Sequence, residues 1–307
     1  MSHYLGIEIG GTKLQLVSGD ADAKIVGRRR FGVERSKGAA GIQEQIEQGL
    51  RDLFSKGRPQ AIGAGFGGPL DWRTGKIYRS HHIEGWSEFE LGNWLQKQSG
   101  APAFIDNDGN VAALAEATHG VAKGFNPVFY VTLGSGVGGG LVVDGKIYHG
   151  ATPGEAEIGH VRLDRSGTTV ESRCSGWAVD ARIRSVKTAK PGSILAGLLG
   201  ESVGGEAKYL ATACEQGDVS AKKILNEIGD DLGFGLSHVV HLFHPQIIVL
   251  GGGLSAVGEP LKVAVQEVLE RFVMEAFKPA PLVMFAQLGE DVVPVGALEL
   301  ARREKGN

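Results

Sequence analysis

The sequence predicts an α/β protein in which one unit of strands and helices occurs twice, giving two lobes with a cleft between them. Two hairpins with glycine turns carry this prediction, one over 4–18 and one over 129–143, and each leads into a third strand. Their sequences, YLGIEIGGTKLQLVSGDADAKI and FYVTLGSGVGGGLVVDGKI, follow one pattern. A chance match is the alternative, because glycine hairpins share composition. The length of 307 residues also favours two domains over one large core.

The elements of the first lobe follow from hydrophobic periodicity. Alternating or apolar runs predict strands at 4–9, 14–18, 25–33, 61–66 and 103–106. Helical spacing of apolar residues predicts helices over 41–54 and 107–119. We expect a first lobe of residues 1–118. A C-terminal helix is predicted at 295–305, in the segment 292–307, and we expect this segment to pack back on the first lobe.

The second lobe is expected over 119–291. Its strands are predicted at 129–133, 141–143, 147–149 and 247–250, and its helices at 219–241 and 263–277. The strand at 247–250 ends in three glycines, 251–253, for which a turn between strand and helix is the simplest interpretation.

Composition excludes several classes of protein. With 32 basic and 35 acidic residues the formal charge is -3, so the chain shows no electrostatic signature of binding nucleic acid or an anionic membrane. No signal peptide and no apolar stretch of about 20 residues is present, and the 2 cysteines form no CxxC pair, so we expect a cytoplasmic protein. Glycine is unusually abundant, at 48 residues, and we expect these glycines in turns or ligand loops.

The glycine loops at 6–13 and 134–138 do not match the known phosphate motifs. The first is close to the phosphate-loop pattern but ends in Gly-Thr-Lys, and strand-like residues follow both loops where those motifs need a helix. Each loop alone could be an ordinary tight turn. Two opposed turns, however, could bring backbone N–H groups close to a triphosphate, with Thr12, Lys13 and Ser135 as further donors.

Six motifs occur in a fixed order: GIEIGGTK, GFGGP, DNDGN, TLGSGVGGG, EIGH and IVLGGG. Together they resemble the ROK family of bacterial sugar kinases and sugar-responsive repressors. The resemblance implies the duplicated, ribonuclease-H-like fold of actin-like ATPases and transfer of the γ-phosphoryl group of ATP, with Mg²⁺, to a sugar hydroxyl. It implies a nucleotide site made of Glu8, Gly10, Gly11, Thr12, Lys13, Gly134, Ser135, Gly136, Gly252 and Gly253, with Mg²⁺ near Glu8.

Phosphoryl transfer to a sugar needs a carboxylate beside the attacking hydroxyl. Asp106 and Asp108 flank Asn107 where a strand leads into a helix, and helix capping is the ordinary alternative, which suits Asp106. The resemblance places the general base on Asp108. It implies that the sugar is held by Gly68, Pro69, Asn107, Asp108, Glu157, His160 and Glu171. Glu157 and His160 lie three residues apart and would share one helical face, although a surface pair is the plainer interpretation.

Two departures from the family pattern concern metals. Glu8 stands where the family most often has Asp, which leaves metal use at this position open. Many members bind zinc through the His of Gly-His and three cysteines, but residues 161–170 contain no cysteine, so we expect no structural zinc. What orients His160 then stays open. His238, His241 and His244 share a spacing of three, but we expect them to complement a helix C-terminus.

The sequence therefore predicts an ATP-dependent hexose kinase, with glucose phosphorylated on its 6-hydroxyl. Another hexose or an N-acetylhexosamine is an alternative substrate, because these sugars differ by few polar contacts. A sugar-binding regulator without catalysis and an ATPase of the actin branch are alternative functions. We expect no room for a helix-turn-helix before Tyr4, as the DNA-binding repressors have. The resemblance also implies a homodimer or a higher homo-oligomer.

Overall fold

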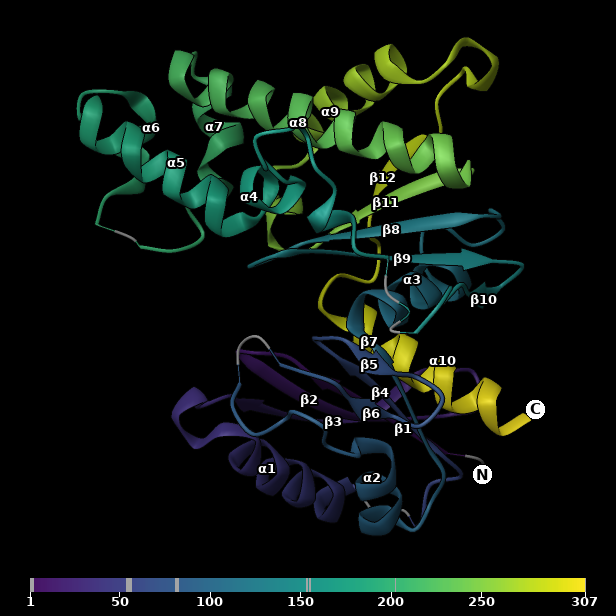
Figure 1. The fold of residues 1–307 in the computed structure, drawn as a ribbon. Coiled ribbons are helices and arrows are strands. Elements are labelled where there is room, and N and C mark those ends of the chain that lie inside the picture. Colours follow the sequence, from purple (N-terminus) through teal and green to yellow (C-terminus); the bar gives the residue numbers. More distant parts are fainter. Residues whose placement is uncertain are drawn as a thin grey trace. The chain divides into compact units, whose positions relative to one another are not determined.

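The computed structural model describes residues 3–53, 57–80, 83–152, 154, 156–201 and 203–306 (Figure 1). Contacts divide the chain into two compact units. Unit 1 contains Met1–Gly124, Gly140–Ala156 and Gln287–Asn307, and unit 2 contains Phe125–Gly139 and Glu157–Ala286. The domain boundaries expected from the sequence, and the cleft between the lobes, stay predictions.

The first sheet has five strands in the order β3-β2-β1-β4-β7. These are β1 (Tyr4–Ile9), β2 (Lys13–Gly19), β3 (Ile25–Gly32), β4 (Ile62–Phe66) and β7 (Ala103–Asn107). β1, β2 and β3 pair antiparallel, whereas β4 is parallel to β1 and β7 is parallel to β4. A small second ladder pairs β5 (Leu70–Asp71) with β6 (Lys76–Ile77).

Helices cover this sheet. They are α1 (Gly38–Leu53), α2 (Leu91–Ser99), α3 (Asp108–His119) and α10 (Val292–Gly306). Helix α1 buries its periodic apolar face, including Ile42, Ile46 and Leu50, against β2 and β3. The helix predicted over 41–54 is confirmed through Leu53, and Phe54 lies outside the described residues. Helix α10 packs against β1, β4 and α3.

The second sheet repeats the order of the first, as β10-β9-β8-β11-β12. Its strands are β8 (Val128–Leu133), β9 (Val137–Val143), β10 (Lys146–Ile147), β11 (Ile247–Gly251) and β12 (Leu282–Phe285). β11 runs parallel to β8 and to β12, as β4 does to β1 and β7. The predicted duplication of an α/β unit is therefore confirmed. The strand expected at 147–149 ends at Ile147, so that prediction was wrong by two residues.

The helices between β10 and β12 form a larger group. They are α4 (Val170–Cys174), α5 (Gly176–Ala189), α6 (Ile194–Leu199), α7 (Leu210–Glu215), α8 (Val219–Phe243) and α9 (Glu259–Phe272). The long helix predicted at 219–241 is confirmed. The helix predicted at 263–277 is wrong at both ends: Pro260 lies in the first turn of α9, where its fixed φ is favourable, and Glu275–Phe277 is a separate 3₁₀ turn.

Many glycines serve close packing and lie outside turns and ligand loops, which corrects the expectation from composition. A Cβ on Gly63 in β4 would lie 1.9 Å from the carbonyl oxygen of Ala297 in α10, and one on Gly6 in β1 would lie 2.7 Å from another α10 carbonyl. Cβ atoms on Gly229 and Gly233 of α8 would lie 2.6 and 2.7 Å from the Cβ atoms of Ala264 and Val268 in α9. Glycine is needed here because two backbones meet where no side chain fits.

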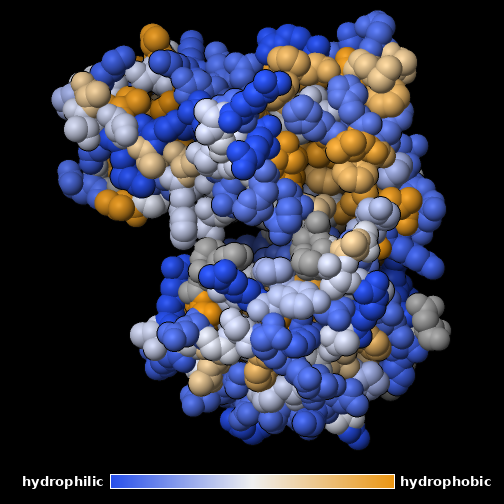
Figure 2. Space-filling model, in the orientation of Figure 1, coloured by the Kyte–Doolittle hydropathy of each residue, from blue (hydrophilic) through white to orange (hydrophobic). Residues whose placement is uncertain are grey.

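Apolar side chains reach the surface of unit 2 around the ends of α8 and α9 and on β12, where Figure 2 shows a group of orange residues. They are Leu242, Phe243, Phe272, Met274 and Leu282. Within the described ranges, no helix combines the length and apolar character needed to cross a bilayer.

Candidate functional site

In unit 1 the predicted site residues meet at one edge of the first sheet. Parallel strands β1, β4 and β7 end together, with Ile9 beside Phe66 and Phe66 beside Asn107. The Gly67 amide donates to the Ile9 carbonyl at 3.1 Å. Gly10, Gly11 and Gly67 line one small cavity at this edge.

Asp108 occupies the first position of α3, beside Gly67. A Cβ on Gly67 would lie 3.3 Å from Asp108 Oδ2, so the absence of a side chain there leaves room at the carboxylate. Asp108 Oδ1 accepts a hydrogen bond from the Gly109 amide at 2.9 Å. The structure thus brings Asp108 to the same edge as the first glycine turn.

The cap of α3 is Asn107, which corrects the assignment of a cap to Asp106. Asn107 Oδ1 accepts hydrogen bonds from the amides of Gly109 at 2.8 Å and Asn110 at 3.4 Å. Asp106 is still part of β7, where it pairs with Gly65, so its side chain starts one residue too early to reach these amides.

Glu8 on β1 is held by two neighbours on β2. Its Oε1 lies 3.3 Å from Lys13 Nζ, and its Oε2 accepts from Gln15 Nε2 at 2.7 Å. Burial raises the pKa of Glu8 above its ordinary value, and Lys13 and Gln15 oppose the effect in part. Lys13 therefore forms an ion pair with this carboxylate.

Arg28, Arg29 and Arg30 lie on β3, at the edge of the sheet as expected, but two of them connect to the interior. Gln15, which is buried, accepts from Arg30 Nε through Oε1 at 2.7 Å. Arg28 and Arg30 also form ion pairs with Asp291 and Glu290, in the 3₁₀ turn just before α10, at 2.7 and 3.3 Å. A polar residue inside an apolar strand, as at Gln15, is the sequence signal that identifies this network.

In both glycine turns the amide of the first glycine donates to a carbonyl further along the turn. The Gly10 amide donates to the Lys13 carbonyl at 3.0 Å, and the Gly134 amide donates to the Gly136 carbonyl at 3.0 Å. Both turns lead into strands, β2 and β9. Each is the turn of a β-hairpin, as the sequence predicts, and neither opens a helix.

In unit 2 the second turn contacts Glu171 in the first turn of α4. Glu171 Oε2 accepts from the Val137 amide at 2.9 Å, and a Cβ on Gly136 would lie 2.6 Å from the same oxygen. Gly176 at the start of α5 donates to the Gly134 carbonyl at 2.7 Å. The structure therefore places Glu171 directly on the 134–136 turn.

Glu157 and His160 flank a short 3₁₀ turn, Ile158–His160. Their side chains are 51% and 75% exposed, and Glu157 Oε2 lies 4.0 Å from His160 Nε2. A Cβ on Gly159 would lie 2.2 Å from the Val137 carbonyl, so this turn packs on the same hairpin as Glu171. The two side chains do share one face, as the spacing of three predicts.

Two other predicted loops have clear structural neighbours. Gly252 has φ 83°, and a Cβ there would lie 2.6 Å from the carbonyl carbon of Leu133, one residue before Gly134. Gly253 begins the following 3₁₀ turn. In unit 1, Gly68 packs against the Arg79 carbonyl, and the Pro69 carbonyl accepts from the Tyr78 amide at 3.1 Å.

The three histidines at the end of α8 each have a protein neighbour. His241 Nε2 accepts from the Met274 amide at 3.1 Å, and His244, the left-handed C-cap of α8, stacks on Phe277. His238 lies edge-on to an aromatic ring of the same helix. In the part of the chain that the structure describes, no group of three or more His, Cys, Asp or Glu side chains is placed to hold a metal ion.

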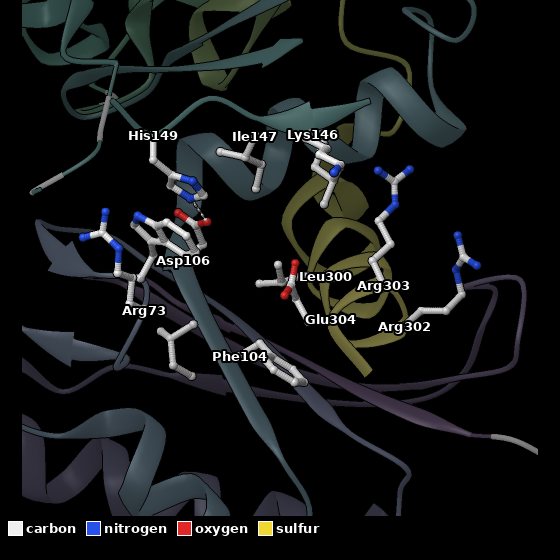
Figure 3. Close-up of a pocket in the computed structure, with 13 residues that line it drawn as sticks. Arg73, Phe104, Asp106, Lys146, Ile147, His149, Leu300, Arg302, Arg303 and Glu304 are labelled. Carbon is white, nitrogen blue, oxygen red and sulfur yellow. Dashed lines mark hydrogen bonds and ion pairs between the residues drawn. The ribbon is translucent and has the colours of Figure 1, made fainter. Parts of the chain in front are cut away.

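A cavity of about 720 Å³ in unit 1 was not expected from the sequence (Figure 3). Residues of β7, β10 and α10 line it, and its wall contains Asp106 and His149 in direct contact. His149 lies outside the six sequence motifs, so the sequence alone gives no signal for its contact with Asp106.

Comparison with known proteins shows the family. The model of the ROK family matches residues 4–304. The chain belongs to the ROK family. The glucokinase of Halalkalibacterium halodurans is 29% identical, over 99% of this chain and 98% of that protein. The Escherichia coli repressor Mlc is 25% identical, over 96% of this chain and 74% of that protein.

Among solved structures, a ROK family glucokinase from Streptomyces griseus in complex with glucose and AMPPNP superposes with a TM-score of 0.85 and 29% identity. The match covers 98% of this chain and all of that one. The ROK protein described here therefore has the duplicated α/β fold of actin-like ATPases, as the order of its strands also shows.

Proposed function

We propose that this ROK family protein is an ATP-dependent hexose kinase that phosphorylates the 6-hydroxyl of glucose. The observation that carries the proposal is the Asp108 carboxylate, in the first turn of α3 and beside Gly67 at the edge where β1, β4 and β7 end. Glucokinases among the relatives, and the glucose and AMPPNP complex of one of them, support it.

Asp108 is the general base of this proposal. Its carboxylate accepts the proton of the attacking hydroxyl while that oxygen bonds to phosphorus. Asp108 lies at the first position of α3, and a helix N-terminus stabilises a nearby negative charge. Gly67 leaves the space in which the hydroxyl approaches Asp108 Oδ2.

We assign the nucleotide to the two glycine turns and the loop after β11. Backbone N–H groups of 10–13 and 134–136 bind phosphate oxygens, Thr12, Lys13 and Ser135 add donors, and Gly252 and Gly253 face the adenosine. Glu8 would hold Mg²⁺, which neutralises phosphate charge when bound. Its carboxylate oxygens are ligands of the kind Mg²⁺ prefers, and the ion would replace the Lys13 ammonium that lies 3.3 Å from Oε1.

We assign the sugar to Asn107, Glu157, His160 and Glu171, with Gly68 and Pro69 in the loop beside it. Asn107 uses Oδ1 as the helix cap, so its Nδ2 is the atom that donates to a sugar hydroxyl. Glu171 binds Val137 through Oε2, so Oε1 is its sugar contact. The exposed Glu157 and His160 supply a carboxylate and an imidazole to further hydroxyls.

Coupled ADP release over a panel of sugars tests the proposal. The panel contains glucose, mannose, fructose, N-acetylglucosamine and N-acetylmannosamine, and glucose should give the highest kcat/KM. Asp108→Asn should lower kcat at least about 100-fold, because general base catalysis contributes that much. Asp22→Asn, an exposed acid in a turn, is the matched control. Near-normal turnover by Asp108→Asn would remove the mechanism.

The relationship to the repressor Mlc favours a second candidate, a sugar-binding regulator without catalysis. Calorimetric binding of a hexose by a protein that releases no ADP would support this candidate instead. The absence of structural zinc and the homo-oligomeric state stay predictions. Elemental analysis that finds one zinc per chain would contradict the first, and a monomer in light scattering would contradict the second.

A further inference from the structure

His149, just after β10, forms a close contact with Asp106 of β7. His149 Nε2 lies 2.6 Å from Asp106 Oδ2, and the two side chains are 15% and 4% exposed. We assign the donor role to His149 Nε2, because an ionised carboxylate only accepts hydrogen bonds. Figure 3 shows the two side chains pointing toward each other in the wall of the cavity.

The other oxygen of Asp106 holds the residues on both sides of Asp108. Asp106 Oδ1 accepts from the Asn107 amide at 2.7 Å and from Asn110 Nδ2 at 3.0 Å. Asn110 Nδ2 also donates to the Gly154 carbonyl at 3.1 Å. One buried carboxylate therefore joins the end of β7, the first turn of α3 and the chain that follows β10.

The position of His149 is itself fixed by packing. Its ring stacks on Trp72, with ring centroids 4.1 Å apart and an angle of 10°. The Arg73 guanidinium lies 5.1 Å from the centre of the same indole and donates to Thr152 Oγ1 at 2.5 Å. Within unit 1, the segment that follows β10 is thus held at His149, at Thr152 and at Gly154.

We propose that His149 is a positioning residue, which through Asp106 fixes the first turn of α3 and so orients Asp108. This inference rests on the proposed kinase function. In this proposal His149 acts through its hydrogen bond to Asp106. Its effect is on the orientation of the Asp108 carboxylate. A displacement of about 1 Å in a reacting group can lower the rate about 100-fold. The phosphate-binding turns do not contain the pair, so affinity for ATP should stay unchanged.

Two substitutions separate the hydrogen bond from the stacking. His149→Phe keeps a ring on Trp72 and removes the donor, and it should lower kcat about 10- to 100-fold with KM for ATP within about twofold of wild type. His149→Gln restores an N–H donor near Nε2 and should recover kcat to within about threefold. Lys146→Ala, which lines the same cavity at an exposed position, is the control and should keep wild-type kcat.

Either of two results overturns the proposal: a Phe variant whose kcat stays within about twofold of wild type, or a Gln variant as slow as the Phe variant. A wild-type protein that phosphorylates no sugar contradicts the proposed function alone. Amide hydrogen exchange then decides the positioning role. The Gly109 and Asn110 amides should exchange at least about tenfold faster in His149→Phe, and unchanged exchange overturns the role.

Discussion

Replacing Glu299 by Gln tests how α10 is held on unit 1. Glu299 is completely buried, and its carboxylate accepts from His119 of α3 at 3.1 Å and from Arg302 at 2.9 and 2.6 Å. Arg303 donates to it as well, and also to Thr118 of α3 at 3.0 Å. The carboxylate therefore connects α10 with α3, the helix that carries Asp108.

The expected loss of stability follows from the pKa of Glu299. Burial alone would raise this pKa, but the hydrogen bonds from Arg302, Arg303 and His119 lower it from 4.5 to about 2. A difference of about 2.5 pKa units corresponds to about 3 kcal/mol. Because the folded pKa is depressed, this stabilisation is complete above the unfolded pKa and is lost as the pH falls toward 2. About 1.4 kcal/mol remains at pH 3.

Urea unfolding followed by tryptophan fluorescence measures the difference, because Trp72, Trp86 and Trp94 all lie in unit 1. Glu299→Gln should lower the free energy of unfolding by about 3 kcal/mol at pH 7 and by about half of that at pH 3. Glu304→Gln, at an exposed position on the same helix, should change it by less than about 0.5 kcal/mol. A Glu299→Gln effect that is equally large at both pH values would refute the electrostatic reasoning.

Three further predictions test packing, charge and reactivity. Gly63→Ala should lower the free energy of unfolding by about 2 kcal/mol or more, since its Cβ would lie 1.9 Å from the Ala297 carbonyl oxygen. A loss below about 0.5 kcal/mol, measured by urea unfolding, would show instead that α10 can shift. Burial raises the pKa of Glu8, so the stability that Glu8 contributes is present below pH 4.5 and is lost as the pH rises through its folded pKa. In urea titrations, Glu8→Gln should therefore have a higher free energy of unfolding than wild type at pH 7 and the same value at pH 4. The same gain at both pH values would contradict this prediction. Burial raises the pKa of the Cys174 thiol to about 12, so alkylation of the native protein should reach Cys214 first; mass spectrometry finding Cys174 modified first would be the contrary result.

Local patterns in the sequence were sufficient for most of the sheet. Strands such as β1 and β4 are short apolar runs bounded by glycine, and the two hairpins repeat one pattern, so the duplication could be predicted before the strand order was known. The short helices α4 to α7 could not be predicted in this way. α4, α6 and α7 span only 5 or 6 residues, so too few turns show a periodic face. α5 is longer, at 14 residues, but buries only Val179, Asp180 and Ile183.

By itself the sequence determined the α/β class, the repeated hairpins and the residues that motifs place at the ends of strands, such as Asp108 after β7. Only the tertiary structure decided which residues those strand ends meet. It showed that Gly63 lets α10 pack closely on β4 and that His149 contacts Asp106. The physical reason is that periodicity and turn chemistry act between near neighbours in the chain, whereas these contacts join residues far apart in sequence through the packing of a helix on a sheet.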